Sequence, residues 1–89
     1  MKDLSLAEQF EFPCEHIFKA LGPNDPAFVD AVRAAVAKVV PVAMDAMKVR
    51  TSGKGNYQSV SILIRVRDFP QLQKIYQQLK QVPNLKYLL

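Results

Sequence analysis

The fold is decided by residues 48–66, which read Lys-Val-Arg-Thr-Ser-Gly-Lys-Gly-Asn-Tyr-Gln-Ser-Val-Ser-Ile-Leu-Ile-Arg-Val. In the second half, β-branched residues at 60, 62, 64 and 66 alternate with Ser59, Ser61, Leu63 and Arg65. A period of two is typical of a strand with one buried face. Between the halves, the glycines and asparagine of residues 53–56 supply the positive φ values that a tight loop needs. The segment therefore predicts a β-hairpin.

The register of this hairpin follows from parity, because opposed residues of an antiparallel pair point to the same face. A slip by one residue would bury Lys48 and Arg50. The predicted pairs are Ser52 with Tyr57, Arg50 with Ser59, Lys48 with Ser61, Val49 with Val60, and Met47 with Ile62.

Four further elements are expected around the hairpin. Residues 14–21 alternate like a strand, which Gly22-Pro23-Asn24 is expected to end. Two amphipathic helices are predicted, one from Asp25-Pro26 to Pro41 and one from Asp68, with Gln71 as its capping partner, to Pro83. The second strand spans residues 42–52 and is irregular near 43–46, and a last strand spans residues 85–89.

This order predicts an α+β fold of the ferredoxin-like βαββαβ type. Right-handed crossovers give a four-stranded antiparallel sheet with both helices on one face. The strand at 57–66 should lie inside the sheet, between the first and second strands. We expect an N-terminal tail over residues 1–12 and a single ferredoxin-like domain over residues 13–89.

The cysteine content and the lack of long apolar runs indicate the cellular compartment of the protein. The one cysteine, Cys14, has no partner for an internal disulfide, which is typical of a reducing compartment. No apolar run approaches the ~18 residues that span a membrane, and the N-terminus lacks the pattern of a secretory signal. We therefore expect a cytoplasmic protein that does not contact membranes.

The net charge of +4 is unevenly distributed: residues 1–45 carry four basic and seven acidic side chains, and residues 46–89 carry eight and one. A basic half is either a solvated surface or a surface that attracts phosphate or an acidic partner.

The sheet face without helices, together with the glycine loop, is the predicted binding surface. On this face basic and polar side chains surround Ile17, Leu21 and Leu63. These polar side chains include Lys19, Ser59 and Ser61. The candidate binding residues are Lys48, Arg50, Gly53, Lys54, Gly55, Asn56, Tyr57, Arg65 and Arg67.

The sequence contains only weak motifs for a catalytic, metal-binding or nucleotide-binding site. Cys14 and His16 fall on one face of a strand, but a nucleophilic pair needs an activating environment, and one Cys with one His is too few for a zinc site. Residues 52–56 lack the spacing of a nucleotide-binding loop and read as a hairpin turn, although their amides are an alternative anion site. We expect no catalysis, no metal and no cofactor.

RNA-recognition domains of the same topology carry aromatic residues in the third strand. Here only Tyr57 occupies such a place, which removes the stacking on which base recognition depends. Nucleic acid is therefore the alternative partner and not the first choice.

The chain resembles the YbeD-like family of small bacterial proteins of unknown function. The likeness is carried by Glu11-Phe12-Pro13, Lys19, Gly22, and above all Ser52-Gly53-Lys54-Gly55-Asn56-Tyr57 followed by Ser59-Val60-Ser61-Ile62. It implies a fold similar to the ACT regulatory domains, which bind small ligands and often pair through sheet edges, and hence a homodimer. It also implies no catalytic residues and a proposed role in regulating lipoate metabolism.

Together these observations predict a small cytosolic regulatory or adaptor domain. Its partner is expected to be a protein or a small metabolite, bound through the open sheet face, a sheet edge or the loop at residues 53–56.

Overall fold

A computed structural model of the 89-residue chain describes residues 11–89. Most of the tail expected at residues 1–12 lies outside the described residues. Phe12 is partly buried and packs against the core. The elements are β1 (Cys14–Pro23), α2 (Pro26–Ala37), the short 3₁₀ helix η1 (Met44–Ala46), β2 (Met47–Thr51), β3 (Tyr57–Val66), α3 (Phe69–Leu79) and β4 (Tyr87–Leu88).

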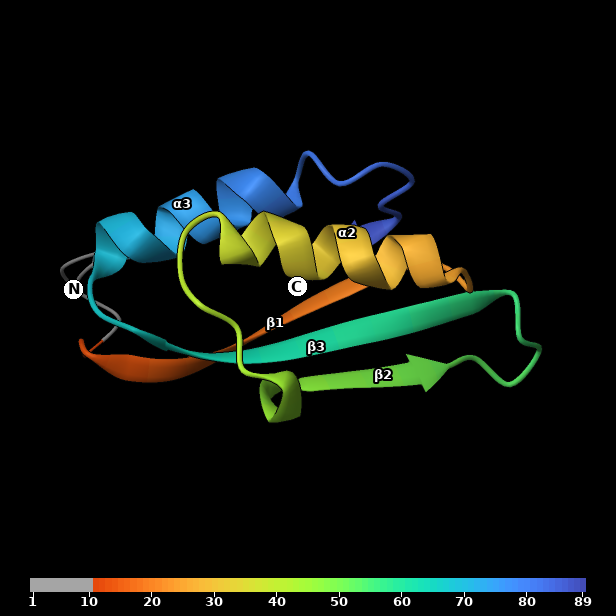
Figure 1. The fold of residues 1–89 in the computed structure, drawn as a ribbon, viewed down its shortest axis with the longest axis horizontal. Helices are drawn as coiled ribbons and strands as arrows, with labels where there is room; N and C mark the ends of the chain where they lie inside the picture. The colour runs from red at the N-terminus through yellow and green to blue at the C-terminus, as the bar shows by residue number, and fades with distance from the viewer. Residues whose placement is uncertain (1–10) are drawn as a thin grey trace, which may run out of the picture.

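The strands form one antiparallel sheet in the order β2-β3-β1-β4. Both α-helices lie side by side on one face of this sheet, and the other face carries no helix (Figure 1). The predicted ferredoxin-like arrangement is confirmed, including the internal position of β3 between β1 and β2.

The predicted hairpin register is also confirmed. Met47 pairs with Ile62, Lys48 with Ser61, Val49 with Val60, and Arg50 with Ser59. The pairing of Ser52 with Tyr57 appears as a backbone hydrogen bond of 2.8 Å from the Ser52 N–H to the Tyr57 carbonyl oxygen.

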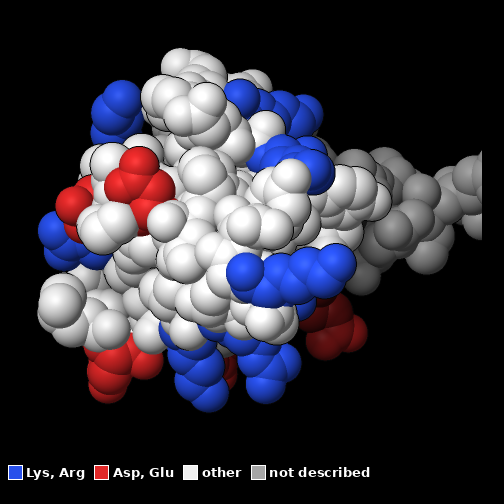
Figure 2. Space-filling model, turned by 90° about the vertical axis from the view of Figure 1, so that its right-hand side faces the viewer, with Lys and Arg blue, Asp and Glu red and all other residues white. Residues whose placement is uncertain are grey.

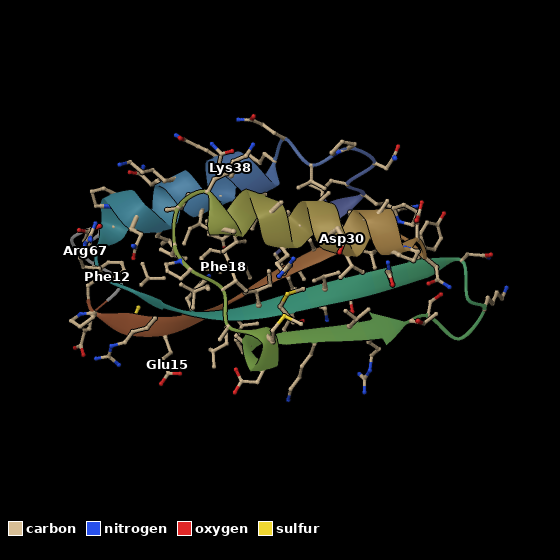
Figure 3. The ribbon with its side chains drawn as sticks, viewed as in Figure 1. Phe12, Glu15, Phe18, Asp30, Lys38 and Arg67 are labelled. Atoms are coloured by element: carbon tan, nitrogen blue, oxygen red, sulfur yellow. The ribbon has the colours of Figure 1, made fainter. Side chains whose placement is uncertain are left out.

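The core lies between the sheet and the two helices. The four alternating residues of β3 are all buried there, with Ile64 the most exposed at 6%. Figure 3 shows Phe18 of β1 in this layer, whereas Glu15 of the same strand projects from the opposite face. The remaining core side chains are Ala20, Phe28, Val32, Ala35, Val36, Val40, Leu72, Ile75, Leu79 and Val82.

Both helices begin at the predicted caps. The Asp25 carboxylate accepts from the Ala27 N–H at 2.9 Å, and the Asp68 carboxylate accepts from the Gln71 N–H at 2.9 Å. The Gln71 side chain also takes part in the cap. Its Oε1 accepts a hydrogen bond of 2.7 Å from the backbone N–H of Arg67, which precedes the capping residue Asp68. Each aspartate thus satisfies a first-turn amide that the helix cannot pair.

Several predicted boundaries differ from the structure. β1 continues through Gly22 and Pro23, which pair with β3. Strand β2 begins only at residue 47, after η1, and regular pairing in β4 covers two residues. The helices end at Ala37 and Leu79, before the prolines, because the chain turns early and buries Val40 and Val82 against the core.

Candidate functional site

The open face of the sheet mixes cations with exposed apolar side chains. Ile17 and Leu63 oppose each other across β1 and β3, and they are 60% and 42% exposed. Tyr87 pairs with Leu21, and Leu89 exchanges backbone hydrogen bonds of 2.8 and 3.1 Å with Lys19. Folding therefore leaves part of the chain's apolar surface on this face in contact with water, as binding surfaces often do.

A basic hollow of about 440 Å³ lies on this face beside the apolar residues. The register places Lys48, Ser61 and Lys19 in one row across three strands, and Arg50 and Ser59 in the next. Among residues 11–89, none of these five side chains makes a hydrogen bond or ion pair with another protein group. The hollow thus presents three cations and two hydroxyl groups whose hydrogen-bonding capacity the described protein leaves open.

Figure 2, viewed from the hairpin end, shows basic side chains projecting from the underside of the sheet, with acidic groups to either side. The arrangement suits an anionic group on a partner, because cations collected on one face raise the local potential.

The predicted hairpin residues form a loop tied to the rest of the fold. The Asn24 side-chain amide donates to the carbonyl oxygen of Gly55 at 2.8 Å. The backbone N–H of Asn24 donates to the carbonyl oxygen of Asn56 at 3.3 Å. Gly55 adopts a φ of 75°. These features are those of a hairpin turn, in agreement with the interpretation favoured from the sequence; Gly53 and Lys54 lie at its exposed tip.

Tyr57 is engaged by a lysine from the other end of the chain. The Lys86 Nζ donates to the Tyr57 hydroxyl at 2.9 Å and lies 4.2 Å from the ring centroid. This hydrogen bond from a cation lowers the pKa of Tyr57. The ring is therefore partly covered by an ammonium group.

The two arginines at the far end of β3 have separate surroundings. Arg65 faces Glu15 across β1 and β3. Arg67 forms an ion pair of 3.1 Å with Asp68, and the pKa of that carboxyl is lowered by the Gln71 N–H and then by Arg67. Figure 3 places Arg67 beside α3, at the opposite end of β3 from the hairpin. At about 3.4 Å per residue, β3 holds the arginines more than about 20 Å from Arg50.

Of the predicted binding residues, the structure therefore brings together Lys48 and Arg50. Lys19, Ser59 and Ser61 complete their hollow, although they were expected only as members of the open face. The hairpin parity already aligned the serines with Lys48 and Arg50, so that signal was present in the sequence. Lys19 depends on the pairing of β1 with β3, for which the sequence has no short connecting turn.

Cys14 and His16 lie on the helix side of β1. The His16 Nε2 is 2.8 Å from the Tyr76 hydroxyl, and its ring packs edge-on against Phe18. Burial lowers the pKa of His16 from its ordinary value of 6.5. Residues 11–89 hold no group of three or more His, Cys, Asp or Glu side chains suited to a metal ion.

We expect the free energy of unfolding to fall as the pH drops from about 7.5 to about 5, because the unfolded chain then binds a proton on His16 more tightly than the folded protein does. His16→Gln should flatten this dependence, since the chain has no other histidine. Urea denaturation at several pH values measures the slope. An unchanged slope in the variant would assign the effect to another group.

A second hollow, about 580 Å³, lies on the helix side between α3 and β4. Its apolar lining comes from Phe69, Leu72, Tyr76 and Leu88, and its polar lining comes from Gln73, Gln77 and Lys80. Within residues 11–89, neither helix has the length and apolar character needed to cross a bilayer.

Comparison with known proteins places the chain in a family. The family model described as "Protein of unknown function (DUF493)" matches residues 7–89. The chain belongs to this family. UPF0250 proteins of Edwardsiella ictaluri (strain 93-146) and Yersinia pestis (strain Pestoides F) are each 36% identical to it over 84 residues, which is 94% of this chain and 95% of theirs. The resemblance to the YbeD-like small bacterial proteins is thereby confirmed, and the DUF493 family carries no assigned function.

Proposed function

We propose that this DUF493 protein is a non-catalytic binding module of the cytoplasm, which recognises a partner protein on the open face of its sheet. The observation that carries the proposal is the juxtaposition of exposed apolar residues with cations that have no partner among residues 11–89. Binding of a partner protein through this face would give the protein an adaptor or regulatory role.

The distribution of the exposed groups favours a protein over a small metabolite. The apolar side chains extend over three strands, from Leu63 on β3 through Ile17 on β1 to Tyr87 on β4. The hollow beside them is half open to solvent and lined by long, exposed cations. Small-molecule sites are usually concave and enclosed, whereas this face resembles the apolar centre and polar rim of a protein interface.

The surroundings of Tyr57 argue against the nucleic-acid alternative. Bases stack on open aromatic faces, and Lys86 already occupies one face of the Tyr57 ring. Glu15, which shares the open face with Arg65, would meet the phosphate backbone unfavourably.

The test compares two variants that carry the same change in charge. Lys48→Glu with Arg50→Glu alters the open face, and Lys74→Glu with Lys80→Glu alters exposed lysines on α3 and at its C-cap. Each variant and the unaltered protein are immobilised, exposed to a bacterial lysate, and analysed by mass spectrometry. We expect a defined set of proteins that the unaltered chain and the α3 variant retain and that the open-face variant loses. Equal retention by both variants would contradict the proposal.

The link to lipoate metabolism rests on the family resemblance alone and would gain support if a retained protein belonged to that pathway. The homodimer that the resemblance implies likewise stays a prediction, which sedimentation measures directly.

A further inference from the structure

In the part of the chain that the structure describes, strand β2 pairs with β3 on one side and with no strand on the other. The bond from Ser52 to Tyr57 makes these residues a hydrogen-bonded pair, and in antiparallel strands such pairs alternate with non-bonded ones. Arg50 and Lys48 therefore bond to β3, whereas the N–H and C=O groups of Met47, Val49 and Thr51 point away from it. Within residues 11–89, no strand lies on that side of β2. These groups form an edge to which another strand can be added.

The two faces of β2 differ in chemistry. Lys48 and Arg50 project onto the open face and line the basic hollow. Met47 and Val49 project toward the helix side, opposite the buried residues Ile62 and Val60. The helices do not cover this edge, since β2 is the strand farthest from them in Figure 1 and Val49 is 48% exposed. An added strand would therefore meet cations on one face and apolar surface on the other.

A second copy of the chain fits this edge poorly. A continuous sheet requires opposed residues to share a face, so an antiparallel self-pairing must centre on a residue of β2. Centring on Val49 sets Lys48 of one copy against Arg50 of the other, and centring on Lys48 or Arg50 opposes each to itself. Centring on Met47 or Thr51 pairs only that one residue of β2 with β2 of the other copy. Like charges directly opposed destabilise a strand pair. Charged edge strands are a common protection against self-association.

We propose that β2 accepts an extended segment of a partner protein as an additional strand, and that this segment alternates acidic with apolar side chains. Acidic residues opposite Lys48 and Arg50 would face the basic hollow, where they meet cations that have no partner among residues 11–89. The apolar residues between them would cover Met47 and Val49, and the outward amides would supply main-chain hydrogen bonds. This inference rests on the proposed function and specifies its partner.

The first test uses two short fluorescent peptides of identical composition. In one, glutamate alternates with valine; in the other, the glutamates precede the valines. We expect the alternating peptide to bind at least about tenfold more tightly, because only its period matches a strand with two different faces. On binding, amide exchange with solvent should slow at Met47, Val49 and Thr51, whose N–H groups point outward. Equal affinity for both peptides, or no binding of the alternating one, would overturn the proposal.

Two variants separate strand addition from plain charge attraction. Lys48→Glu with Arg50→Glu should weaken binding at least about tenfold, because attraction across each opposed pair becomes repulsion. Val49→Pro removes an outward donor but no bond to β3, a position where edge strands tolerate proline. It should weaken binding comparably, and amide spectra verify that the variant is folded. Lys74→Glu with Lys80→Glu, whose exposed lysines lie on the helix side of the sheet, is the control of equal charge and should bind as the unaltered chain does.

The outcomes distinguish this inference from the proposed function. Loss of binding in the charge variant but not in Val49→Pro, with no slowing of amide exchange, would overturn strand addition and leave recognition by the open face intact. Dimerisation that Val49→Pro abolishes would show that a second copy occupies the edge, which also overturns the inference. If Lys74→Glu with Lys80→Glu weakened binding equally, the effect would come from net charge alone, and strand addition would be overturned as well.

Discussion

Replacing Gly22 with alanine should lower the free energy of unfolding by about 3 kcal/mol, an unusually large cost for one methyl group. Gly22 is buried in β1, and a Cβ built there would lie 2.3 Å from two ring atoms of Phe28 and 2.7 Å from a third. Real Cβ atoms essentially never come within 3.0 Å of a neighbour. The ring has little freedom to retreat, because Phe28 is itself 3% exposed and fixed to the first turn of α2.

Gly53→Ala is the matched control. It adds the same methyl group to a glycine with no atom within 4 Å of the new Cβ and no positive φ. We expect a change of less than about 0.5 kcal/mol. Chemical denaturation of both variants gives the comparison.

A double-mutant cycle assigns the cost of the first variant to the ring. Phe28→Leu makes room above Gly22, so adding Gly22→Ala to it should cost clearly less than adding the same change to the unaltered chain. Equal costs in the two backgrounds would show that the strand, and not the contact with Phe28, resists the methyl group.

The role of Gly22 also shows where prediction from the sequence ends. In the sequence, Gly22-Pro23-Asn24 reads as a strand breaker, because glycine and proline are frequent in turns. The structure keeps both Gly22 and Pro23 in β1, where the missing side chain lets Phe28 approach the sheet. Such an approach joins two elements in space, and no local pattern encodes it.

Local patterns were sufficient for the hairpin and the helix starts. Burial of one face fixes the register of residues 47–62, and an aspartate followed within two residues by proline fixes where each helix begins. The helix ends were misplaced because proline limits how far a helix can extend without requiring it to extend that far. After each helix ends, the chain turns and buries Val40 or Val82 in the core.

Some residues of the candidate site could likewise be predicted from the sequence, and others could not. Lys48 and Arg50 were predicted together because they belong to one strand. The approach of Lys19 to them, and of Lys86 to Tyr57, depends on pairings between residues far apart in the sequence. The alternation of residues within a strand predicts which side chains share a face. The register between strands that are distant in the sequence depends on the packing of the complete core.

Alanine substitutions at two neighbouring residues of β3 test whether the open face is exposed to solvent. Ile62→Ala should lower the free energy of unfolding by about 3 to 4 kcal/mol, because Ile62 is fully buried and the vacated space remains under two helices. Leu63→Ala removes a similar side chain from the opposite face, where Leu63 is 42% exposed. Its cost should stay below about 1 kcal/mol, mainly from the lost cross-strand contact with Ile17.

Ile62→Val, expected to cost about 1 kcal/mol, keeps the comparison measurable if the alanine variant does not fold. Unfolding in urea at two protein concentrations completes the experiment. Comparable costs at positions 62 and 63 would mean that the face of Leu63 is covered in solution, and a dependence of that cost on concentration would assign the cover to a second copy. A small, concentration-independent cost at Leu63 means that this leucine is not needed for folding, which leaves it free to contact a partner.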